Sequence, residues 1–240
     1  MNKLIEFKNV TVSLGERTLY ENLNFAINTG DCLMLTGDNG TGKSLLLELI
    51  ALGNTYDLRS RYKGLKVSGE ILDANGENLL DPTIENRKIV YVTQNEDFYK
   101  NATILSEVNS ACAGMGIELA EKELDELLRY FEIATGKNKR LKNHLSYGEG
   151  KIVHLIANIL KLKHANLLLM DEPLNHLAFK NSKRLNDLII KIKKEKPDLA
   201  ILVVSHCCAI NFVDGALRYN VEKKIMEKNK YVSYDCFDRV

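Results

Sequence analysis

The stretch GDNGTGKS, residues 37–44, decides the fold of this 240-residue chain. It matches the pattern G-x-x-x-x-G-K-[ST], in which glycines let the backbone wrap around a phosphate group and point its N–H groups inward. The run CLMLTG (32–37) before it is almost entirely apolar, as in a strand buried on both faces, and SLLLELIALGN (44–54) after it has the length and composition of a helix. A loop in this setting predicts an α/β protein that binds phosphate groups.

This loop supplies the groups that hold the phosphates of a nucleotide. Lys43 is expected to reach the β- and γ-phosphates, and Ser44 to offer its hydroxyl to Mg²⁺. The helix that starts near Lys43 adds the positive end of its dipole. The alternative is a glycine-rich turn that carries a lysine by chance, and the flanking strand and helix disfavour it. The residues expected to contact the nucleotide here are Gly37, Asp38, Asn39, Gly40, Thr41, Gly42, Lys43, Ser44 and Leu45.

A second apolar run, LLLMDEP (167–173), ends in two acids. The run places Asp171 and Glu172 at the C-terminal edge of a sheet, where α/β proteins bind ligands. Asp171 suits a carboxylate that holds Mg²⁺ through water, and Glu172 suits a general base that activates an attacking water. Alone, the pair would indicate a solvated acidic turn. The phosphate loop upstream favours the nucleotide site instead.

Composition and charge set the class of protein. Hydrophobic residues make up 45% and charged residues 27% of the chain, which is typical of a globular domain with a substantial core. The net charge of +1 does not indicate nucleic acid or an anionic membrane surface as the main partner. We see neither a signal peptide nor an apolar run near the roughly 20 residues that span a bilayer. Five irregularly spaced cysteines indicate a reducing compartment and buried, inert thiols.

Strand-like and helix-like stretches alternate along the chain, which predicts a mostly parallel sheet flanked by helices. The segment VSGEILDANGENL (67–79), with Asp-Ala-Asn-Gly at its centre, predicts a hairpin. We expect strands in 4–14, 19–27, 32–37, 88–94, 165–173 and 199–206, helices in 44–54, 103–142, 151–163 and 181–196, and a final hairpin in 216–235.

These motifs, in this order, resemble those of the ATP-binding cassette (ABC) ATPases over nearly the whole chain. GDNGTGKS matches the Walker A motif, and LLLMDEP matches Walker B with its catalytic glutamate. Four further features fall at the family's Q-loop, signature, D-loop and switch histidine, in that order: Gln94, LSYGE (145–149), LNHLA (174–178) and His206. The resemblance implies a P-loop NTPase core with a mostly parallel sheet, an N-terminal antiparallel β subdomain and a helical signature subdomain at about 97–160, all in one domain of residues 1–240.

The resemblance also implies roles and partners. Two cassettes, as a homodimer or a heterodimer, would close head to tail around two ATP molecules. Ser146 and Gly148 would contact the nucleotide of the second cassette, and a helix starting near Gly150 would aim its dipole at that nucleotide. Within one chain, the implied catalytic residues are Lys43, Gln94, Glu172 and His206, and the implied magnesium ligands are Ser44, Gln94 and Asp171.

Several residues depart from the family pattern. Tyr147 and Glu149 replace a glycine and a glutamine of the signature, and Ala178 replaces the usual aspartate of the D-loop. Leu45 stands where a second hydroxyl is usual, and Leu14 near the place of an aromatic residue that stacks on adenine. The departures fall on fine contacts with the nucleotide and on contacts between subunits, whereas the lysine, hydroxyl, glutamine, aspartate, glutamate and histidine of the chemistry are all present. We therefore predict an active, magnesium-dependent ATPase.

The favoured function is the ATP-hydrolysing subunit of an ABC transporter. It would act on a separate transmembrane permease subunit, in the cytoplasm on the inner face of the cell membrane, without nucleic acid. Phe98 and Tyr99 are candidate contacts with that subunit, or else pack within the helical part. Two alternatives stay open: a soluble ATPase like the ABC-F proteins, acting on ribosomes or nucleic acid, and a degenerate regulatory cassette. The transported substrate and the direction of transport are not encoded in these motifs.

Overall fold

The computed structural model describes residues 2–84, 88–94, 102–133, 145–206, 210–220 and 222–230, and the structural statements below concern these ranges. The strands are β1 (Lys3–Leu14), β2 (Arg17–Asn28), β3 (Cys32–Thr36), β4 (Leu65–Asp73), β5 (Ile89–Val92), β6 (Leu167–Asp171), β7 (Ala200–Val204), β8 (Gly215–Asn220) and β9 (Ile225–Lys230). The helices are α1 (Lys43–Leu52), α2 (Tyr56–Arg61), α3 (Ile104–Ala113), α4 (Glu121–Tyr130), α6 (Tyr147–Lys161) and α7 (Phe179–Glu195).

A six-stranded sheet in the order β5-β6-β7-β3-β8-β9 forms the centre of the molecule. Its neighbouring strands run parallel except for the final β8–β9 hairpin, which is antiparallel as expected. Every residue of β6 and β7 is buried, which explains why these strands are continuous apolar runs. The predicted α/β fold class is therefore confirmed, and the carboxyl ends of β3, β6 and β7 meet at one edge.

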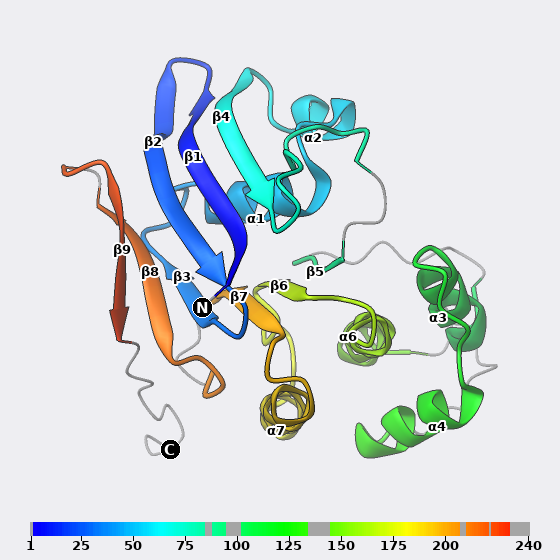
Figure 1. Cartoon of the computed structure of the whole chain (residues 1–240). Helices are drawn as coiled ribbons and strands as arrows, with labels where there is room; N and C mark the ends of the chain where they lie inside the picture. The colour runs from blue at the N-terminus through cyan, green and yellow to red at the C-terminus, as the bar shows by residue number, and fades with distance from the viewer. Residues whose placement is uncertain are drawn as a thin grey trace.

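The N-terminal strands form a separate antiparallel sheet in the order β2-β1-β4, in the upper half of Figure 1. The hairpin predicted for residues 67–79 is only partly present. A turn follows β4, but the second arm makes a single isolated bridge, between Leu72 and Asn78. The arm is short because Leu79 and Leu80 turn into the core, where they are 2% and 9% exposed.

Alternate residues of the central strands divide between two apolar cores. Leu167 and Leu169 of β6 pack with α1 and the antiparallel sheet, whereas Leu168 and Met170 pack with α3, α4, α6 and α7. Figure 1 shows α6 and α7 below the central strands, and α3 and α4 to one side of α6. The sheet thus separates two layers, as expected from buried parallel strands.

The helical segment 103–142 is not continuous. It contains α3 and α4, and residues 114–120 between them are not helical. Gly114 ends α3, and Gly116 has a positive φ of 67° that a helix does not allow. Residues 134–144, like Phe98 and Tyr99, lie outside the described ranges.

Helix α6 begins at Tyr147, three residues before the predicted start near Gly150. The cause is a capping box: the Ser146 hydroxyl accepts a hydrogen bond from the backbone N–H of Glu149, and the Glu149 side chain accepts one from the backbone N–H of Ser146. Two N–H groups at the start of the helix are satisfied in this way. The signature residues therefore form the first turn of α6.

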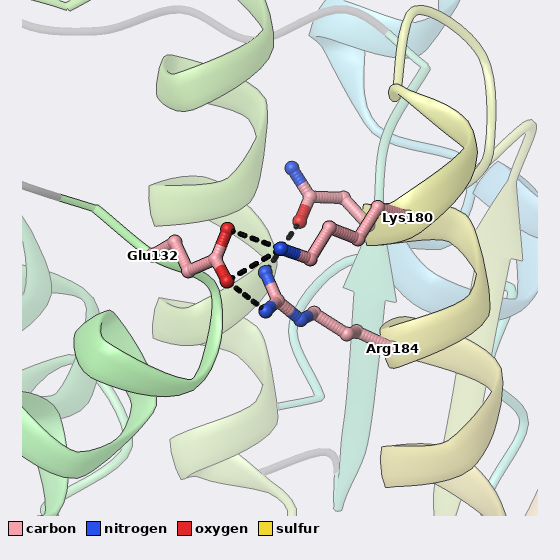
Figure 2. Close-up of polar contacts among 4 residues, drawn as sticks. Glu132, Lys180 and Arg184 are labelled. Carbon is pink, nitrogen blue, oxygen red and sulfur yellow. Dashed lines mark hydrogen bonds and ion pairs between the residues drawn. The ribbon is translucent and has the colours of Figure 1, made fainter.

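The end of α4 is tied to α7 by charged side chains. Figure 2 shows Lys180 and Arg184 pointing from α7 toward the carboxylate of Glu132. Lys180 Nζ donates to both carboxylate oxygens, at 2.6 and 2.8 Å, and Arg184 donates to Oε1.

In the ranges described above, α6, α7 and the shorter helices lack the combination of length and apolar character that would span a bilayer.

Cys32 and Cys112 are buried and free, as expected, and the other three cysteines lie outside the described ranges.

Candidate nucleotide-binding site

A cavity of about 500 Å³ opens at the edge of the central sheet where β3, β6 and β7 end. The parallel strands bring to this edge residues that are far apart in the chain. The predicted site residues that line the cavity are Asn39, Gly40, Gly42, Lys43, Ser44, Leu45, Gln94, Asp171, Glu172 and His206. Three other loop residues, Gly37, Asp38 and Thr41, line a neighbouring cavity of about 560 Å³ between the loop, β2 and β8.

The loop is shaped by a close approach of its backbone to β2. Gly42, the residue that caps α1, has a φ of 89°, and a Cβ atom there would lie 2.9 Å from Cδ1 of Leu19. The positive φ favours glycine at this position, and a larger residue would also have to displace the end of the Leu19 side chain. Lys43 follows and is 8% exposed; its Nζ donates to the carbonyl oxygens of Gly37 and Asp38 at 2.9 and 2.8 Å. A positive charge is thereby held against the loop at the N-terminus of α1, where a phosphate group is favoured.

Asp171 and Ser44 form the part of the site that suits a divalent cation. Burial raises the pKa of Asp171 above its usual value, while a hydrogen bond from the Ser44 hydroxyl and the charge of Lys43 act in the opposite direction. Oδ1 of Asp171 is buried and has no hydrogen-bond partner within the described ranges. One carboxylate and one hydroxyl suit Mg²⁺, which usually takes few protein ligands and completes its shell with phosphate and water.

Asp171 and Ser44 provide only two of the ligands that a magnesium ion needs. Across the described residues, no group of three or more His, Cys, Asp and Glu side chains could hold a metal ion. A magnesium ion here would therefore take its remaining ligands from the nucleotide, from water and from the predicted ligand Gln94.

Glu172 follows Asp171 at the end of β6, with its carboxylate directed at His206. The side chain is 4% exposed; its Oε2 accepts a hydrogen bond from the backbone N–H of His206 at 3.2 Å, and its Oε1 lies 3.4 Å from Nε2 of the same residue. Glu172 has a φ of 48°, a left-handed conformation that costs about 1–3 kcal/mol for such a residue. An oriented, nearly buried carboxylate beside a phosphate loop can act as a general base.

The signature residues lie apart from the cavity. Ser146 and Gly148 do not line it; they form the N-terminal turn of α6. Glu149 Oε2 accepts hydrogen bonds from both the N–H and the hydroxyl of Ser146, at 2.8 and 2.9 Å, so its charge is directed at the cap. This placement is compatible with the expected role of the turn at the nucleotide of a second subunit.

Four lining residues were missed by the sequence analysis: Leu19, Tyr62, Asn175 and Val204. Asn175 belongs to the LNHLA segment and Val204 lies two residues before His206, so both could have been identified from the motifs. Tyr62 comes from a segment of mixed composition that carries no motif. Leu19 and Leu14 give the cavity an apolar wall near the place where the resemblance implies an aromatic residue.

Comparison with known proteins gives a consistent result. Residues 20–175 match the sequence model of the family described as ABC transporter. The chain is 28% identical over 205 residues to the ergothioneine transport ATP-binding protein EgtV of Helicobacter pylori, covering 85% of this chain and 90% of that protein. It is 26% identical to the ribosome protection protein VmlR of Bacillus subtilis, over 85% of this chain but 31% of that protein.

A solved structure of an ATP binding subunit of an ABC transporter superposes with a TM-score of 0.75, covering 95% of this chain and 90% of that one. Its sequence is 22% identical, so the superposition shows the fold alone.

Proposed function

This chain belongs to the ABC transporter family, and from that membership we propose that it is the ATP-hydrolysing subunit of a transporter, driving a separate transmembrane subunit. The observation that carries the proposal is the convergence of Lys43, Ser44, Asp171, Glu172 and His206 on one cavity at the edge of a parallel sheet. Relatives such as EgtV, which is named as a transport ATP-binding protein, support it.

Each of these residues has a distinct part in hydrolysis. Lys43 and the loop amides would hold the β- and γ-phosphates, and Ser44 and Asp171, with Gln94, would hold Mg²⁺, which when bound would neutralise charge on the phosphates. Glu172 takes a proton from the attacking water. His206, whose Nε2 lies 3.4 Å from the Glu172 carboxylate, holds the γ-phosphate beside that water in this proposal.

A second cassette completes the site in this proposal. Ser146 and Gly148 contact the nucleotide of the other subunit, and the N-terminus of α6 directs its dipole at that phosphate. The pair is either a homodimer or a heterodimer. We propose that the chain is one nucleotide-binding domain whose helical part spans about residues 97–160, and that it works in the cytoplasm on the inner face of the membrane through its permease.

The hydrolytic step is tested with Glu172→Gln, which keeps the size of the side chain and removes its basicity. Turnover of ATP should fall at least about 100-fold while a fluorescent ATP analogue still binds. Glu195→Gln, at an exposed acid near the end of α7, is the matched control, and chelation of Mg²⁺ tests the metal. Equal turnover in the wild type and Glu172→Gln would show that Glu172 is not the base.

One observation favours a second candidate, an action on ribosomes. The chain is similar to a ribosome protection protein, although it covers a minor part of that relative. The net charge of +1 gives no broad electrostatic attraction to RNA. Affinity purification in the presence of ATP separates the two: recovery of a membrane protein supports the transporter subunit. Sedimentation with ribosomes, and no membrane protein, would replace that proposal.

A further inference from the structure

Lys151, in the second turn of α6, is completely buried. Lysine is almost never buried in this way unless it is paired, because an ammonium group loses its hydration. Its Nζ donates a hydrogen bond to the main-chain carbonyl oxygen of Glu172, at 3.2 Å. The contact joins residues 21 positions apart in the chain and places the amino group of Lys151 at the main chain of the proposed general base.

The carbonyl group that Lys151 contacts belongs to a residue with an unusual backbone. Glu172 is left-handed, with a φ of 48°. Its N–H donates to the carbonyl oxygen of Val204 at 2.9 Å, and its carbonyl oxygen also accepts from the N–H of Asn175 at 3.2 Å. Lys151 of α6 therefore adds a second donor to the carbonyl oxygen of Glu172. The orientation of the Glu172 backbone decides where the Glu172 side chain points.

The N-terminal end of α6 also lies close to the turn that follows Glu172. A Cβ atom on Gly148 would lie 3.3 Å from the carbonyl oxygen of His176, so helix and turn are in close contact there. Lys151 and Gly148 are three residues apart and lie on one side of the helix. The first turns of α6 thus lie against the segment from Glu172 to His176.

We propose that Lys151 is a positioning residue, which holds Glu172 in its left-handed conformation and ties the general base of one nucleotide site to the helix that contacts the nucleotide of the other. This inference rests on the proposed function. A lysine that served the fold alone would have no effect on the direction of the carboxylate. Removal of the amino group should therefore change turnover if Lys151 positions Glu172, and change only stability if Lys151 serves the fold alone.

The Lys151→Met variant makes that distinction. Methionine has a similar length, favours helices and needs no hydration, so replacing the buried charge should leave the melting temperature unchanged or raised. We expect kcat to fall at least about tenfold and the KM for ATP to change less than about twofold, because the nucleotide contacts remain. The matched control is Lys161→Met, the same change at the other end of α6, with kcat expected within about twofold of the wild type.

Combination with Glu172→Gln gives a stricter test. Since Lys151 acts through Glu172, adding Lys151→Met to Glu172→Gln should lower the residual turnover by less than about twofold. Should the methionine variant fail to fold, Lys151→Gln, which keeps a donor and removes the charge, serves in the same comparisons.

The proposal is overturned by wild-type turnover in a folded Lys151→Met variant. It is also overturned by a parallel loss of melting temperature and ATP binding, or by a crystal structure of the variant in which Glu172 keeps its left-handed φ and its carboxylate direction. An inactive wild type would instead contradict the proposed function, and the crystal structure would still decide the role of Lys151.

Discussion

The rings of Tyr147 and His176 meet edge to face, with centroids 5.2 Å apart and planes at 89°. Tyr147 is the residue that departs most from the signature pattern, and His176 lies in the turn that follows Glu172. Tyr147 is 59% exposed, so the contact leaves much of its ring free on the surface. The Tyr147 ring therefore packs within this chain, where it links α6 to the turn between Glu172 and α7.

Replacement of Tyr147 by glycine should lower ATP turnover, by about two- to tenfold. An aromatic pair of this geometry contributes about 0.5–1.5 kcal/mol, and glycine in the first turn of a helix is less favourable than most residues. Tyr147→Phe keeps the ring and should stay within about twofold of the wild type. Steady-state turnover at saturating ATP measures both. Faster hydrolysis by Tyr147→Gly would mean that the tyrosine hinders the proposed closure on a second subunit.

The fold could be predicted largely because buried parallel strands have a distinctive composition. Runs such as LLLM in β6 are apolar on both faces, and their carboxyl ends meet at one edge, so motif order alone indicated that Lys43, Asp171 and His206 would come together. The start of α6 could also have been predicted at Tyr147 instead of near Gly150, since Ser146 and Glu149 have the spacing of a capping box.

Other features depend on contacts that no local pattern encodes. Lys151 stands in an apolar helical run, and nothing in that run shows that its ammonium group reaches the carbonyl oxygen of Glu172. Tyr62 reaches the cavity only because of the path taken by the chain between α2 and β4. Tertiary packing determines both placements.

The Glu132 contacts with α7 should contribute a small, salt-sensitive stabilisation. Arg184 first, and then Lys180, lowers the pKa of Glu132 from its usual 4.5 to about 2. The folded state therefore binds fewer protons than the unfolded state between these values, so the contribution is present above pH 4.5 and is lost as the pH falls toward 2. Because the group is exposed, Glu132→Gln should lower the melting temperature by only about 1–2 °C.

Salt provides the check on this prediction. In 1 M sodium chloride the screening length is about 3 Å, so the difference between wild type and Glu132→Gln should largely disappear. The control is Glu195→Gln, since Glu195 is exposed and lies 4.0 Å from its partner Lys191. Its melting temperature should equal that of the wild type at both salt concentrations. A difference that persists in high salt would show that Glu132 acts through packing.

Ala178→Asp should stabilise the protein by about 1 kcal/mol. Ala178 is the residue that caps the N-terminus of α7; it has an extended backbone, with φ −61° and ψ 148°, and no side-chain hydrogen bond to the helix. Aspartate in this conformation can accept from a backbone N–H of the first turn, which contains no acidic residue, and its charge complements the helix dipole. Ala178→Asn separates the hydrogen bond from the charge. Urea unfolding measures both, and unchanged midpoints would exclude a capping effect.

His154 should make the protein sensitive to mild acid. Burial, with the charges of Lys161 and Lys151, lowers the pKa of His154 from 6.5 to about 4, and its Nε2 lies 3.1 Å from the side-chain amide of Asn158. Between these pH values the unfolded chain binds the additional proton. Stability is therefore complete above about pH 6.5 and decreases as the pH falls, by about 2 kcal/mol at pH 5.

The His154→Gln variant isolates this effect, because its amide oxygen can accept from Asn158 and does not titrate. Urea unfolding of both proteins at pH 7 and pH 5 should show a larger loss for the wild type, with the difference close to 2 kcal/mol. A parallel loss in the two proteins would mean that His154 becomes protonated within the folded state, with its proton accommodated in α6. The acid sensitivity would then arise from other groups.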